Sequence, residues 1–530
     1  MVNRIPMVMM VSSRLSMNLQ SCLRTVSSQS PYKKVVFLSA ALAISVWLYS
    51  IASNTYTAIH HDHCLNWSTS ADIVIPDAEQ LHQMSLYRIS CLYQRYVTSL
   101  QGLCTEPKRF GNVEYGGVRI CADSAVVPSR GCVIYSYNHE LSGRFVKQID
   151  AQYKCSVVFF GNESHTQKNM NFGGFNRVVN NYGHELSVVI LKIRAKDFPF
   201  LLEFSKSVNQ VNVKQIILEL HYDRNKEKIG DYVMLLNALR ELRASNYAIY
   251  WFDRNWEFVE NSRTKQRRSK CFTVNMYRRS QIPTGISHQE SNGALSDVDL
   301  PQIAPIGTKS IEKDTALKYQ EWFAKFISKH LFLCKQMLRL GNIVDGGWEV
   351  CHDFRFRPKP PCVVYSIGIS YDFSFDEDME KTYGCDVFSF DPSMNTGNYR
   401  HSDHIMFYQV GLGDHVGEIE VKGSKWKIKT LMAIMKELGH TNKRIDVLKI
   451  DIEGSERQSL VEIMESGALK NVVQLCLEFH SYYDLGAMRK LYDLGFRVFW
   501  AHQNPQAPMY TTNETYSYGM EVYFVNINIK

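Results

Sequence analysis

The sequence has little net charge for its length and no concentrated basic region. Its 530 residues include 60 Lys and Arg against 53 Asp and Glu, and the net charge of +7 is spread thinly. Because nucleic-acid binding usually shows as basic residues clustered on one face, we expect no nucleic-acid partner. With 45% hydrophobic residues, the composition is that of a globular protein with material for two or three domains.

Charge is absent from residues 35–53, VVFLSAALAISVWLYSIAS, a length that just spans a bilayer as one helix. Basic residues precede this segment, whereas no Lys or Arg occurs from Ser53 to Tyr87. The positive-inside rule therefore predicts a cytosolic tail (1–34), a retained membrane anchor, and a lumenal remainder. A cleaved signal peptide, with a processing site near Ser50 and Ala52, is the alternative.

Cysteine is frequent for a cytosolic chain. Thirteen cysteines favour an oxidising compartment. Three glycosylation sequons, at Asn66, Asn162 and Asn513, agree with that location. The prediction is a single-pass type II protein of the Golgi or another secretory-pathway membrane.

The spacing of eight cysteines indicates an internal repeat. Four in the first half are separated by 17, 11 and 23 positions, and four in the second half repeat these separations at an offset of 230. The two sets are Cys104, Cys121, Cys132 and Cys155, and Cys334, Cys351, Cys362 and Cys385. We expect a bridge between Cys362 and Cys385, and its counterpart between Cys132 and Cys155, at matching heights on neighbouring strands. The other two pairings of each set stay open.

The repeat predicts two related domains in tandem. After a lumenal stalk (54–80), the first copy covers 81–278, a linker rich in Pro and Gly covers 279–314, and the second copy covers 315–530. In the second copy, strands alternate with helical segments, and the last two strands are separated by a loop. This order predicts an α/β fold with a doubly wound, Rossmann-like sheet of seven strands and an antiparallel hairpin at its end.

One stretch of the second copy, IDVLKIDIEGSER (445–457), joins an apolar strand to a polar turn. Asp451 and Glu453 alternate with Ile452, so a continuing strand would place both carboxylates on one face. Ligands bind at this carboxyl edge in open α/β sheets. Capping of the following helix is the alternative role. Two carboxylates at the end of an apolar strand are, however, costly in desolvation free energy, which favours a functional role.

The motifs of the second copy resemble those of a known family. In chain order they are VYSIGISYDFSFDEDM, FSFDPSM, WKIKTL, VLKIDIEGSE and LEFH. They resemble the S-adenosylmethionine-dependent methyltransferase domain of the methyltransferase-like protein 24 group, which is related to the FkbM methyltransferases. The resemblance covers about 316–530, with 81–278 as a degraded copy. It implies a seven-stranded, Rossmann-like methyltransferase fold and bound S-adenosylmethionine, but it leaves the methyl acceptor open.

Several residues are candidates to hold this cofactor. Gly368 ends the first strand, where a side chain would obstruct the cofactor, although a simple turn is the alternative. Asp391 ends the second strand and could accept hydrogen bonds from both ribose hydroxyls, with an Asp-Pro turn as its alternative. The GLGD segment is expected to line the adenine. The full expected set is Ser366, Gly368, Asp391, Gly413, Asp414 and Asp451.

Methyl transfer to a hydroxyl needs in-line positioning and a base that takes the proton. The expected catalytic residues are Asp451, Glu453 and His480, with His480 or Glu453 as the base. A structural pair of Glu478 and His480 is the alternative, since ELH recurs in the first copy. A metal bound by Asp451 and Glu453 is a further possibility that the sequence does not decide, and no metal ligand is assigned.

The first copy lacks the polar residues of the second. Aligned by sequence, Gly368 corresponds to Asn138 and Asp391 to Gly161, while Asp451 corresponds to Arg194 and Glu453 to Lys196. The apolar strands and cysteines are retained. This selective loss indicates a domain kept for structure or binding.

The sequence therefore predicts a secretory-pathway methyltransferase that acts on a hydroxyl acceptor, with a glycan as a plausible substrate. One alternative is a type II glycosyltransferase with Asp376-Glu-Asp378 as a DxD element. The other is a non-catalytic binding protein built from two retired methyltransferase domains.

Overall fold

The computed structural model describes most of the chain beyond residue 71. The described residues are 64, 72–112, 117–160, 186–211, 213–261, 267–279, 323, 326, 327, 329–480, 485–504 and 519–529. The predicted anchor (35–53), the three sequons and the linker from 280 onward lie outside them. Among the described residues, no helix combines the length and the hydropathy needed to cross a membrane. Residues Asp62–Lys530 form one compact unit, which contains both of the large sheets.

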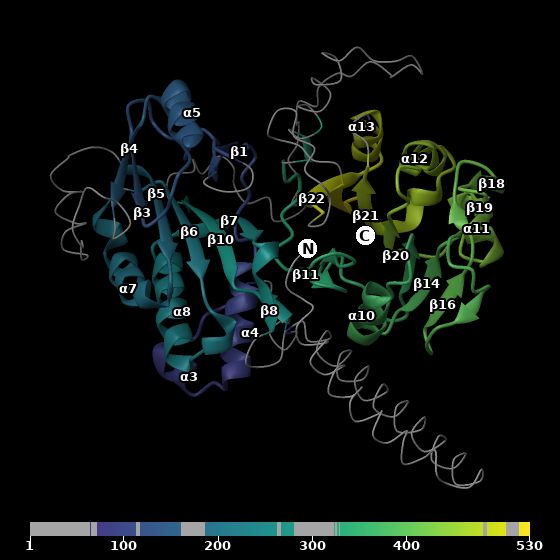
Figure 1. Ribbon diagram of the computed structural model, residues 1–530, viewed down its shortest axis with the longest axis horizontal. Helices are drawn as coiled ribbons and strands as arrows, with labels where there is room; N and C mark the ends of the chain where they lie inside the picture. The colour runs from purple at the N-terminus through teal and green to yellow at the C-terminus, as the bar shows by residue number, and fades with distance from the viewer. Residues whose placement is uncertain are drawn as a thin grey trace, which may run out of the picture. The chain divides into compact units, whose positions relative to one another are not determined.

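The first large sheet has six described strands in the order β4-β3-β5-β6-β10-β7. Strands β3 to β6 are parallel, and β10 lies antiparallel between β6 and β7. Helices α7 (Phe198–Ser207) and α8 (Ile229–Ala244) pack side by side next to it (Figure 1). The strands are β3 (Val133–Tyr137), β4 (Ser156–Phe160), β5 (Leu186–Ile193), β6 (Gln215–His221), β7 (Tyr247–Arg254) and β10 (Cys271–Arg278).

The second large sheet has the order β15-β16-β14-β13-β20-β21-β23-β22. The predicted α/β fold is confirmed, with parallel strands followed by an antiparallel pair. The short strand β15 adds an eighth member, antiparallel to β16. The strands are β13 (Val363–Ile367), β14 (Asp386–Phe390), β15 (Tyr399–Arg400), β16 (Ile405–Tyr408), β20 (Ile445–Ile450), β21 (Val472–Phe479), β22 (Phe496–Gln503) and β23 (Met520–Asn526).

Both sheets connect their corresponding strands in the same order. The order β4-β3-β5-β6-β10-β7 matches β14-β13-β20-β21-β23-β22 strand for strand. In the second sheet the chain passes from β13 to β14 on one side and later returns to β20 on the other side of β13. The carboxyl ends of β13 and β20 therefore form the point where the strand order reverses, which is where open α/β sheets bind ligands.

The remaining helices and strands are short. The helices are α3 (Ala78–His82), α4 (Leu86–Val97), α5 (Gly143–Tyr153), α10 (Ser374–Tyr383), α11 (Leu431–Glu437), α12 (Glu456–Glu465) and α13 (Leu485–Asp493). Two-stranded sheets pair β1 (Pro107–Phe110) with β2 (Val118–Cys121), β8 (Val259–Asn261) with β9 (Arg267–Ser269), and β11 (Met337–Leu340) with β12 (Trp348–Cys351). A separate three-stranded sheet contains β17 (Gly411–Leu412), β18 (Gly417–Val421) and β19 (Ser424–Lys429).

Strand β20 is buried along its whole length although it contains Asp446 and Lys449. Burial on both faces is typical of a central parallel strand. The Asp446 carboxylate accepts hydrogen bonds from the Val363 N–H and from Arg444. The Lys449 ammonium donates to the Gly368 carbonyl at 2.5 Å. Both charged groups are thus paired, as burial requires.

Five disulfides are present in the described part of the chain. The predicted bridges Cys362–Cys385 and Cys132–Cys155 are confirmed. Each joins the residues that directly precede two neighbouring parallel strands, as the pairing of Val363 with Asp386 shows. The other bridges are Cys104–Cys121, Cys334–Cys351 and Cys64–Cys91. The last one ties a residue of the predicted stalk to helix α4.

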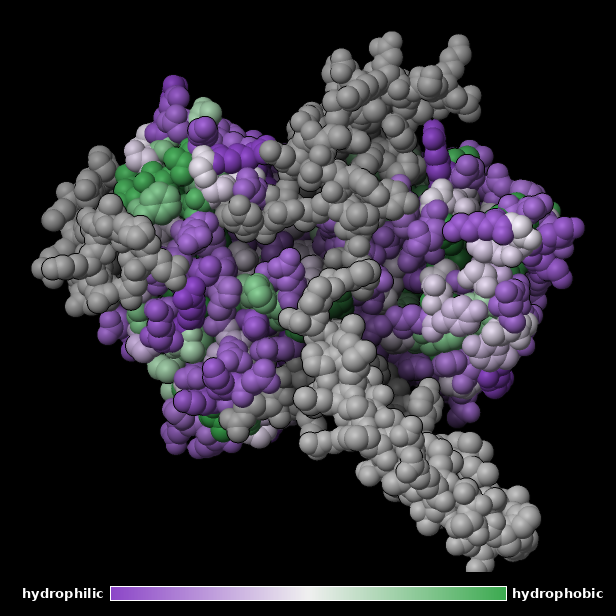
Figure 2. Space-filling model, viewed as in Figure 1, coloured by the Kyte–Doolittle hydropathy of each residue, from purple (hydrophilic) through white to green (hydrophobic). Residues whose placement is uncertain are grey.

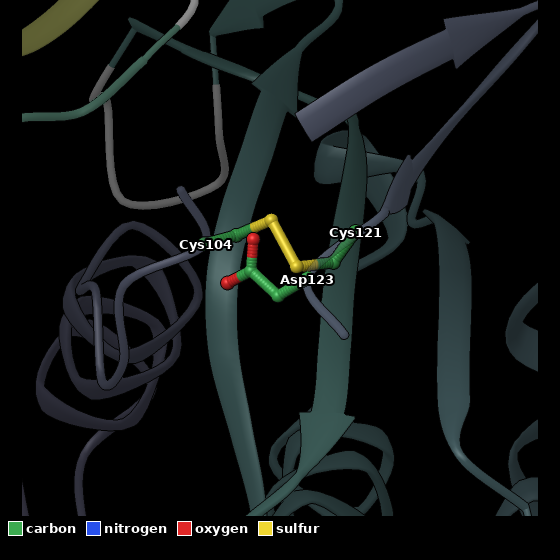
Figure 3. Close-up of side chains that lie close together, drawn as sticks. All are labelled: Cys104, Cys121 and Asp123. Atoms are coloured by element: carbon green, nitrogen blue, oxygen red, sulfur yellow. A yellow bond between two sulfur atoms is a disulfide. The ribbon is translucent and has the colours of Figure 1, made fainter. Parts of the chain in front are cut away.

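An aspartate lies beside the Cys104–Cys121 bridge (Figure 3). The Asp123 carboxylate accepts hydrogen bonds from the Thr105 and Glu106 N–H groups at 3.0 and 2.9 Å. Asp353 does the same beside Cys334–Cys351 for two N–H groups, and burial raises the pKa of Asp353 to about 6. These aspartates fix the chain next to each bridge. The sulfurs are committed to disulfides, so the trios are not metal sites.

The face of the molecule seen in Figure 2 is mainly hydrophilic, with an apolar area over the β4 edge of the first sheet. Phe159 of β4 is 40% exposed. The corresponding strand of the second sheet, β14, is covered by β16. The described first sheet ends at β4, and the residues that follow β4 lie outside the described part.

We expect the bridge Cys362–Cys385 to contribute substantially to stability. It closes a loop of 23 residues, and replacing both cysteines by serine should lower the free energy of unfolding by about 3 kcal/mol. Chemical denaturation measures this change. Peptide mapping without reduction should recover all five pairs, and Cys476→Ser, at a cysteine outside the disulfides, should leave that map unchanged. A different pairing in the wild type would contradict the connectivity.

Candidate active site

The turn after β20 brings the two predicted carboxylates together, but not by strand alternation. Strand β20 ends at Ile450, and the chain then turns with positive φ at Glu453 and Gly454. The Asp451 side chain is 24% exposed and that of Glu453 is 84% exposed. Their carboxylates and the His480 ring nevertheless offer ligand atoms within 4.8 Å of one another. The predicted cluster is therefore present, with Glu453 at its solvent side.

A third acidic residue, Glu456, holds this turn in place. One oxygen of its buried carboxylate accepts from the Ile452 N–H and the other from the Gly454 N–H, both at 2.8 Å. Ser455, the N-cap residue of helix α12, makes no side-chain capping bond. Glu456 was not among the residues predicted for the site. An acidic residue directly after Gly-Ser at a helix start was the available signal.

His480 follows β21 and lies at the centre of four carboxylates. Its Nδ1 atom is 3.0 Å from Glu456, while Nε2 faces Glu453, Glu478 and Asp451 at 3.5, 3.6 and 3.9 Å. Burial alone would lower the pKa of His480, but the hydrogen bond with Glu456 and the surrounding negative charge raise it to about 9. The ring is thus an imidazolium at neutral pH, with Nδ1–H donating to Glu456.

Protonation of His480 changes the expected division of roles. An imidazolium has no lone pair with which to accept a proton or bind a metal ion. The structure therefore favours a carboxylate as the base, in place of His480. It also makes the trio of Asp451, Glu453 and His480 a poor metal site at neutral pH.

The pKa values of Asp451 and Glu478 lie on opposite sides of pH 7. Burial raises the pKa of Asp451 to about 6, against the opposing charge of Lys449, whose ammonium is 4.0 Å away. Burial and the charge of Asp451 raise the pKa of Glu478 to about 8. Glu478 accepts hydrogen bonds from the Asn504 amide at 3.2 and 3.1 Å. At pH 7, Asp451 is thus mostly ionised yet more basic than an ordinary carboxylate.

Glycine at position 368 is required by the packing of two strand ends. Its φ is +79°, and a Cβ atom at this position would lie 1.6 Å from the Asp451 carbonyl oxygen. The close approach seen here is between the ends of β13 and β20. The absence of a side chain lets the turn that carries Asp451 pack against β13.

Asp391 lies at the carboxyl end of β14, as predicted, and is nearly saturated with hydrogen bonds. Its Oδ2 accepts from the Ser370 N–H at 2.9 Å, and Oδ1 accepts from the N–H and hydroxyl of Ser393 at 2.8 and 2.6 Å. A carboxylate offers about four acceptor positions, so about one remains. In this arrangement Asp391 can accept one hydroxyl hydrogen bond, and a second would require Ser393 to turn away.

Three expected cofactor residues lie apart from this cluster. Ser366 is fully buried inside β13, between Ser389 and Lys449 of the neighbouring strands. Gly413 follows β17 in the three-stranded sheet, where it packs on Ile428. Asp414 is exposed and lies 2.7 Å from the imidazole of His415. The GLGD segment (411–414) begins shortly after β16, which ends at Tyr408, and its first two residues form β17 of the separate sheet.

The carboxylates of the expected DxD element, Asp376 and Asp378 of α10, are buried in the protein core. Asp376 accepts from the Ser389 hydroxyl at 2.7 Å, and Asp378 accepts from the Gly341 N–H at 2.7 Å. Burial raises the pKa of Asp376 to about 6. Because metal and sugar-nucleotide binding needs accessible carboxylates, these contacts speak against the glycosyltransferase alternative.

Strand register corrects the correspondence between the two sheets. Tyr137 pairs with Leu191, and Ile367, 230 positions later, pairs with Ile450. Lys192 therefore takes the place of Asp451, and Arg194 takes that of Glu453. The sequence alignment was displaced by two residues because both segments are apolar with few fixed points. Asn138 has a φ of +51°, so it adopts the left-handed conformation of Gly368. Gly161 lies outside the described residues.

Comparison with known proteins agrees with this geometry. Residues 259–500 match a family model described as a methyltransferase domain. The chain is 28% identical over 178 residues to probable methyltransferase-like protein 24 of Homo sapiens, which covers 31% of this chain and 48% of that protein. It is also 28% identical over 171 residues to the Rattus norvegicus protein of the same name, covering 30% and 46%. The chain thus spans about half the length of the curated relatives it matches.

The second large sheet, with its cluster at the strand-order reversal, thus lies mostly within the residues that match the methyltransferase-domain model. The chain's sequence relatives include methyltransferase-like protein 24, which confirms the resemblance seen in the motifs.

Among solved structures, the chain is similar to Haemonchus contortus phospholethanolamine N-methyltransferase 2 in complex with phosphomonomethylethanolamine and S-adenosylhomocysteine. The sequence identity is 11% and the TM-score 0.20, over 69% of this chain and 79% of that chain. No conclusion is drawn from so low a TM-score.

Gly368→Ala should disrupt the site by steric collision. The added Cβ would meet the Asp451 carbonyl, so we expect a loss of at least about 3 kcal/mol in the free energy of unfolding. Gly397→Ala is the matched control, since Gly397 has φ +70° with nothing within 4 Å of a Cβ. It should cost only about 1 kcal/mol for the left-handed backbone. Equal losses in urea denaturation would contradict the close approach.

The charge on His480 should make stability depend on pH. Its folded pKa of about 9 exceeds the ordinary value of 6.5, so its contribution is complete below pH 6.5 and is lost as pH rises toward 9. Across this range we expect the free energy of unfolding to fall by on the order of 2 kcal/mol more in the wild type than in His480→Gln. His415→Gln, at an exposed histidine, should behave as the wild type does. Parallel pH profiles for His480→Gln and the wild type would contradict the raised pKa.

Proposed function

We propose that the second large sheet binds S-adenosylmethionine and transfers its methyl group to a hydroxyl acceptor. The observation that carries this proposal is the cluster of Asp451, Glu453, Glu478 and His480 at the reversal of strand order, with Asp391 at the end of the neighbouring strand β14. The match to a methyltransferase domain over residues 259–500 supports it.

The residues at the end of β14 fit this cofactor. Asp391 is held rigidly by two backbone N–H groups and keeps about one acceptor position for a ribose hydroxyl. When bound, the cofactor supplies an electrophilic methyl group on a sulfonium cation. The carboxylates around His480 create a negative environment beside that position, which favours a cationic ligand.

Asp451 is the base of the proposed mechanism. Its raised pKa makes it a better proton acceptor than an ordinary aspartate while it remains mostly ionised at neutral pH. The Lys449 ammonium lies 4.0 Å from Oδ2 of Asp451 and favours its ionised form. Glu453, exposed at the mouth of the cluster, can contact the acceptor, and His480 with Glu456 positions the turn. His480 and Glu456 are thus positioning residues in this proposal.

A secretory-pathway location belongs to the same proposal. The five disulfides support an oxidising compartment, in agreement with the anchor predicted at 35–53. In that compartment sugar hydroxyls are abundant acceptors, so we propose a glycan substrate and a single-span membrane protein of the Golgi or a related membrane. The shared strand order and disulfides support an origin of both sheets by duplication, with Lys192 and Arg194 marking the first one as inactive in methyl transfer.

Cofactor binding to the full chain is the first test. Calorimetry should show S-adenosylmethionine binding to the wild type and at least about tenfold weaker binding to Asp391→Ala, which loses a hydrogen bond to a charged group. Asp414→Asn is the control and should bind as the wild type does. Absence of binding by folded wild-type protein would turn the preference to a non-catalytic binding protein.

Turnover separates binding from catalysis. Asp451→Asn should keep cofactor affinity within a few fold but lower methyl transfer by about 10²–10⁴, because the base is removed. The measurement is incorporation of labelled methyl groups into glycan, glycoprotein and lipid fractions. Failure to label any of these fractions with a wild type that binds the cofactor would overturn the hydroxyl acceptor.

A further inference from the structure

The first large sheet has its own polar cluster at the strand ends that correspond to the candidate active site. Glu219 and His221 end β6, Cys271 begins β10, and the three offer ligand atoms within 4.8 Å of one another. Cys271 pairs with His221 across the two strands. The Sγ atom of Cys271 is 3.5 Å from Nε2 of His221, and the same nitrogen contacts the Glu219 carboxylate. This cluster is unrelated to the proposed methyl transfer.

Cys271 has no cysteine counterpart in the second sheet. Thr273 pairs with Glu219, and Glu521 pairs with Glu478 in the second sheet, so Cys271 occupies the position of Gly519. His139, after β3, likewise stands where the second sheet has Ile369, 230 positions later. The first sheet thus has a thiol (Cys271) and an additional imidazole (His139) that the second sheet lacks. They lie at the same end of the strands as Lys192, which replaces Asp451.

The donor set has the chemistry of a zinc site. Zinc takes imidazole nitrogen at about 2.0 Å, thiolate sulfur at about 2.3 Å and carboxylate oxygen at about 2.1 Å in tetrahedral geometry. Those bond lengths place sulfur and nitrogen about 3.5 Å apart, which is the separation of Cys271 Sγ and His221 Nε2. A thiolate and a carboxylate also neutralise a divalent cation. Three protein ligands leave one position of the tetrahedron open.

Two neighbours set the electrostatics of this cluster. His139 Nε2 lies 2.6 Å from the second oxygen of Glu219, where it orients the carboxylate as an outer-shell partner does. The Lys192 ammonium lies 3.5 Å from the first oxygen and competes with a cation for it. The Lys192 side chain is partly exposed, so it can turn toward solvent when Glu219 binds a metal ion.

We propose that Glu219, His221 and Cys271 bind a zinc ion in the first large sheet, with His139 orienting Glu219. The ion links the end of β6 to the start of β10, and its fourth position is open to water or to a small ligand. Binding releases the thiol proton of Cys271 and leaves both histidines neutral.

Metal analysis of the full chain tests this site. Protein prepared without a histidine tag and dialysed against zinc should hold about one zinc ion per chain by mass spectrometry. Cys271→Ser and His221→Gln should each weaken binding at least about tenfold, whereas Cys476→Ser, at the other buried cysteine outside the disulfides, should not. Cobalt substitution should add a thiolate-to-metal absorption band that Cys271→Ser abolishes. Near-UV circular dichroism checks that each variant is folded.

Three outcomes would overturn the proposal. Wild-type protein without zinc would mean that Glu219, Lys192 and the two histidines form only an ion-pair network. Zinc retained by Cys271→Ser and His221→Gln but lost in Glu453→Gln would place the metal in the second sheet. A cobalt spectrum without a thiolate band would exclude Cys271 as a ligand. Because none of these depends on S-adenosylmethionine, they stand apart from the test of methyl transfer.

Discussion

The contact between Glu456 and His480 is the interaction on which the candidate site depends. The Glu456 carboxylate holds two backbone N–H groups of the turn after β20 and also accepts from His480 after β21. It therefore joins the ends of two neighbouring strands through one buried anion. Burying that anion is acceptable only because all its partners are donors. The positive charge it induces on His480 in turn allows Asp451 and Glu478 to lie close together without prohibitive repulsion.

The two large sheets show how one strand order supports different chemistry. The sequence ELH (219–221) at the end of β6 corresponds to EFH (478–480), which spans the end of β21 and the next residue, so both sheets have a Glu and a His at the same place. In the second sheet the neighbouring strand adds the carboxylate of Asp451, and burial raises the pKa values of the acidic pair. In the first sheet it adds Lys192. Burial would raise the pKa of Glu219, but hydrogen bonds from His139 and His221 hold it well below its usual range.

Much of the fold could be predicted from the sequence because the signals were local or repeated. The cysteine spacing indicated two of the bridges, and apolar runs ending in polar residues located β13, β14 and β20. Asp391, Asp451 and His480 were found for the same reason, since each directly follows a buried strand, and Glu453 lies two residues beyond Asp451.

What could not be predicted depends on contacts between distant segments. The need for glycine at position 368 comes from the Asp451 carbonyl, 83 residues away in the chain. The role of Glu456 depends on a left-handed turn at Glu453, which its residue type does not favour. The protonation of His480 follows from four carboxylates, three in the turn at 451–456 and one, Glu478, on β21. Ser366 was expected beside the cofactor, yet it lies in β13, which is buried on both of its faces.

The first sheet also reaches the candidate site through a chain of buried charges. Arg254, at the end of β7, lies 3.2 Å from Glu349, which accepts from Arg339 at 2.6 Å. Arg339 is 3.6 Å from Glu521 on β23, and the charge of Glu521 contributes to the raised pKa of Glu478. Phe252 of β7 also stacks on Trp500 of β22, with ring centres 4.5 Å apart. The first sheet lacks the carboxylates of the candidate site, but through Arg254 it supplies a positive charge that balances the buried Glu349 and Glu521. This charge balance gives a physical reason to retain the first sheet.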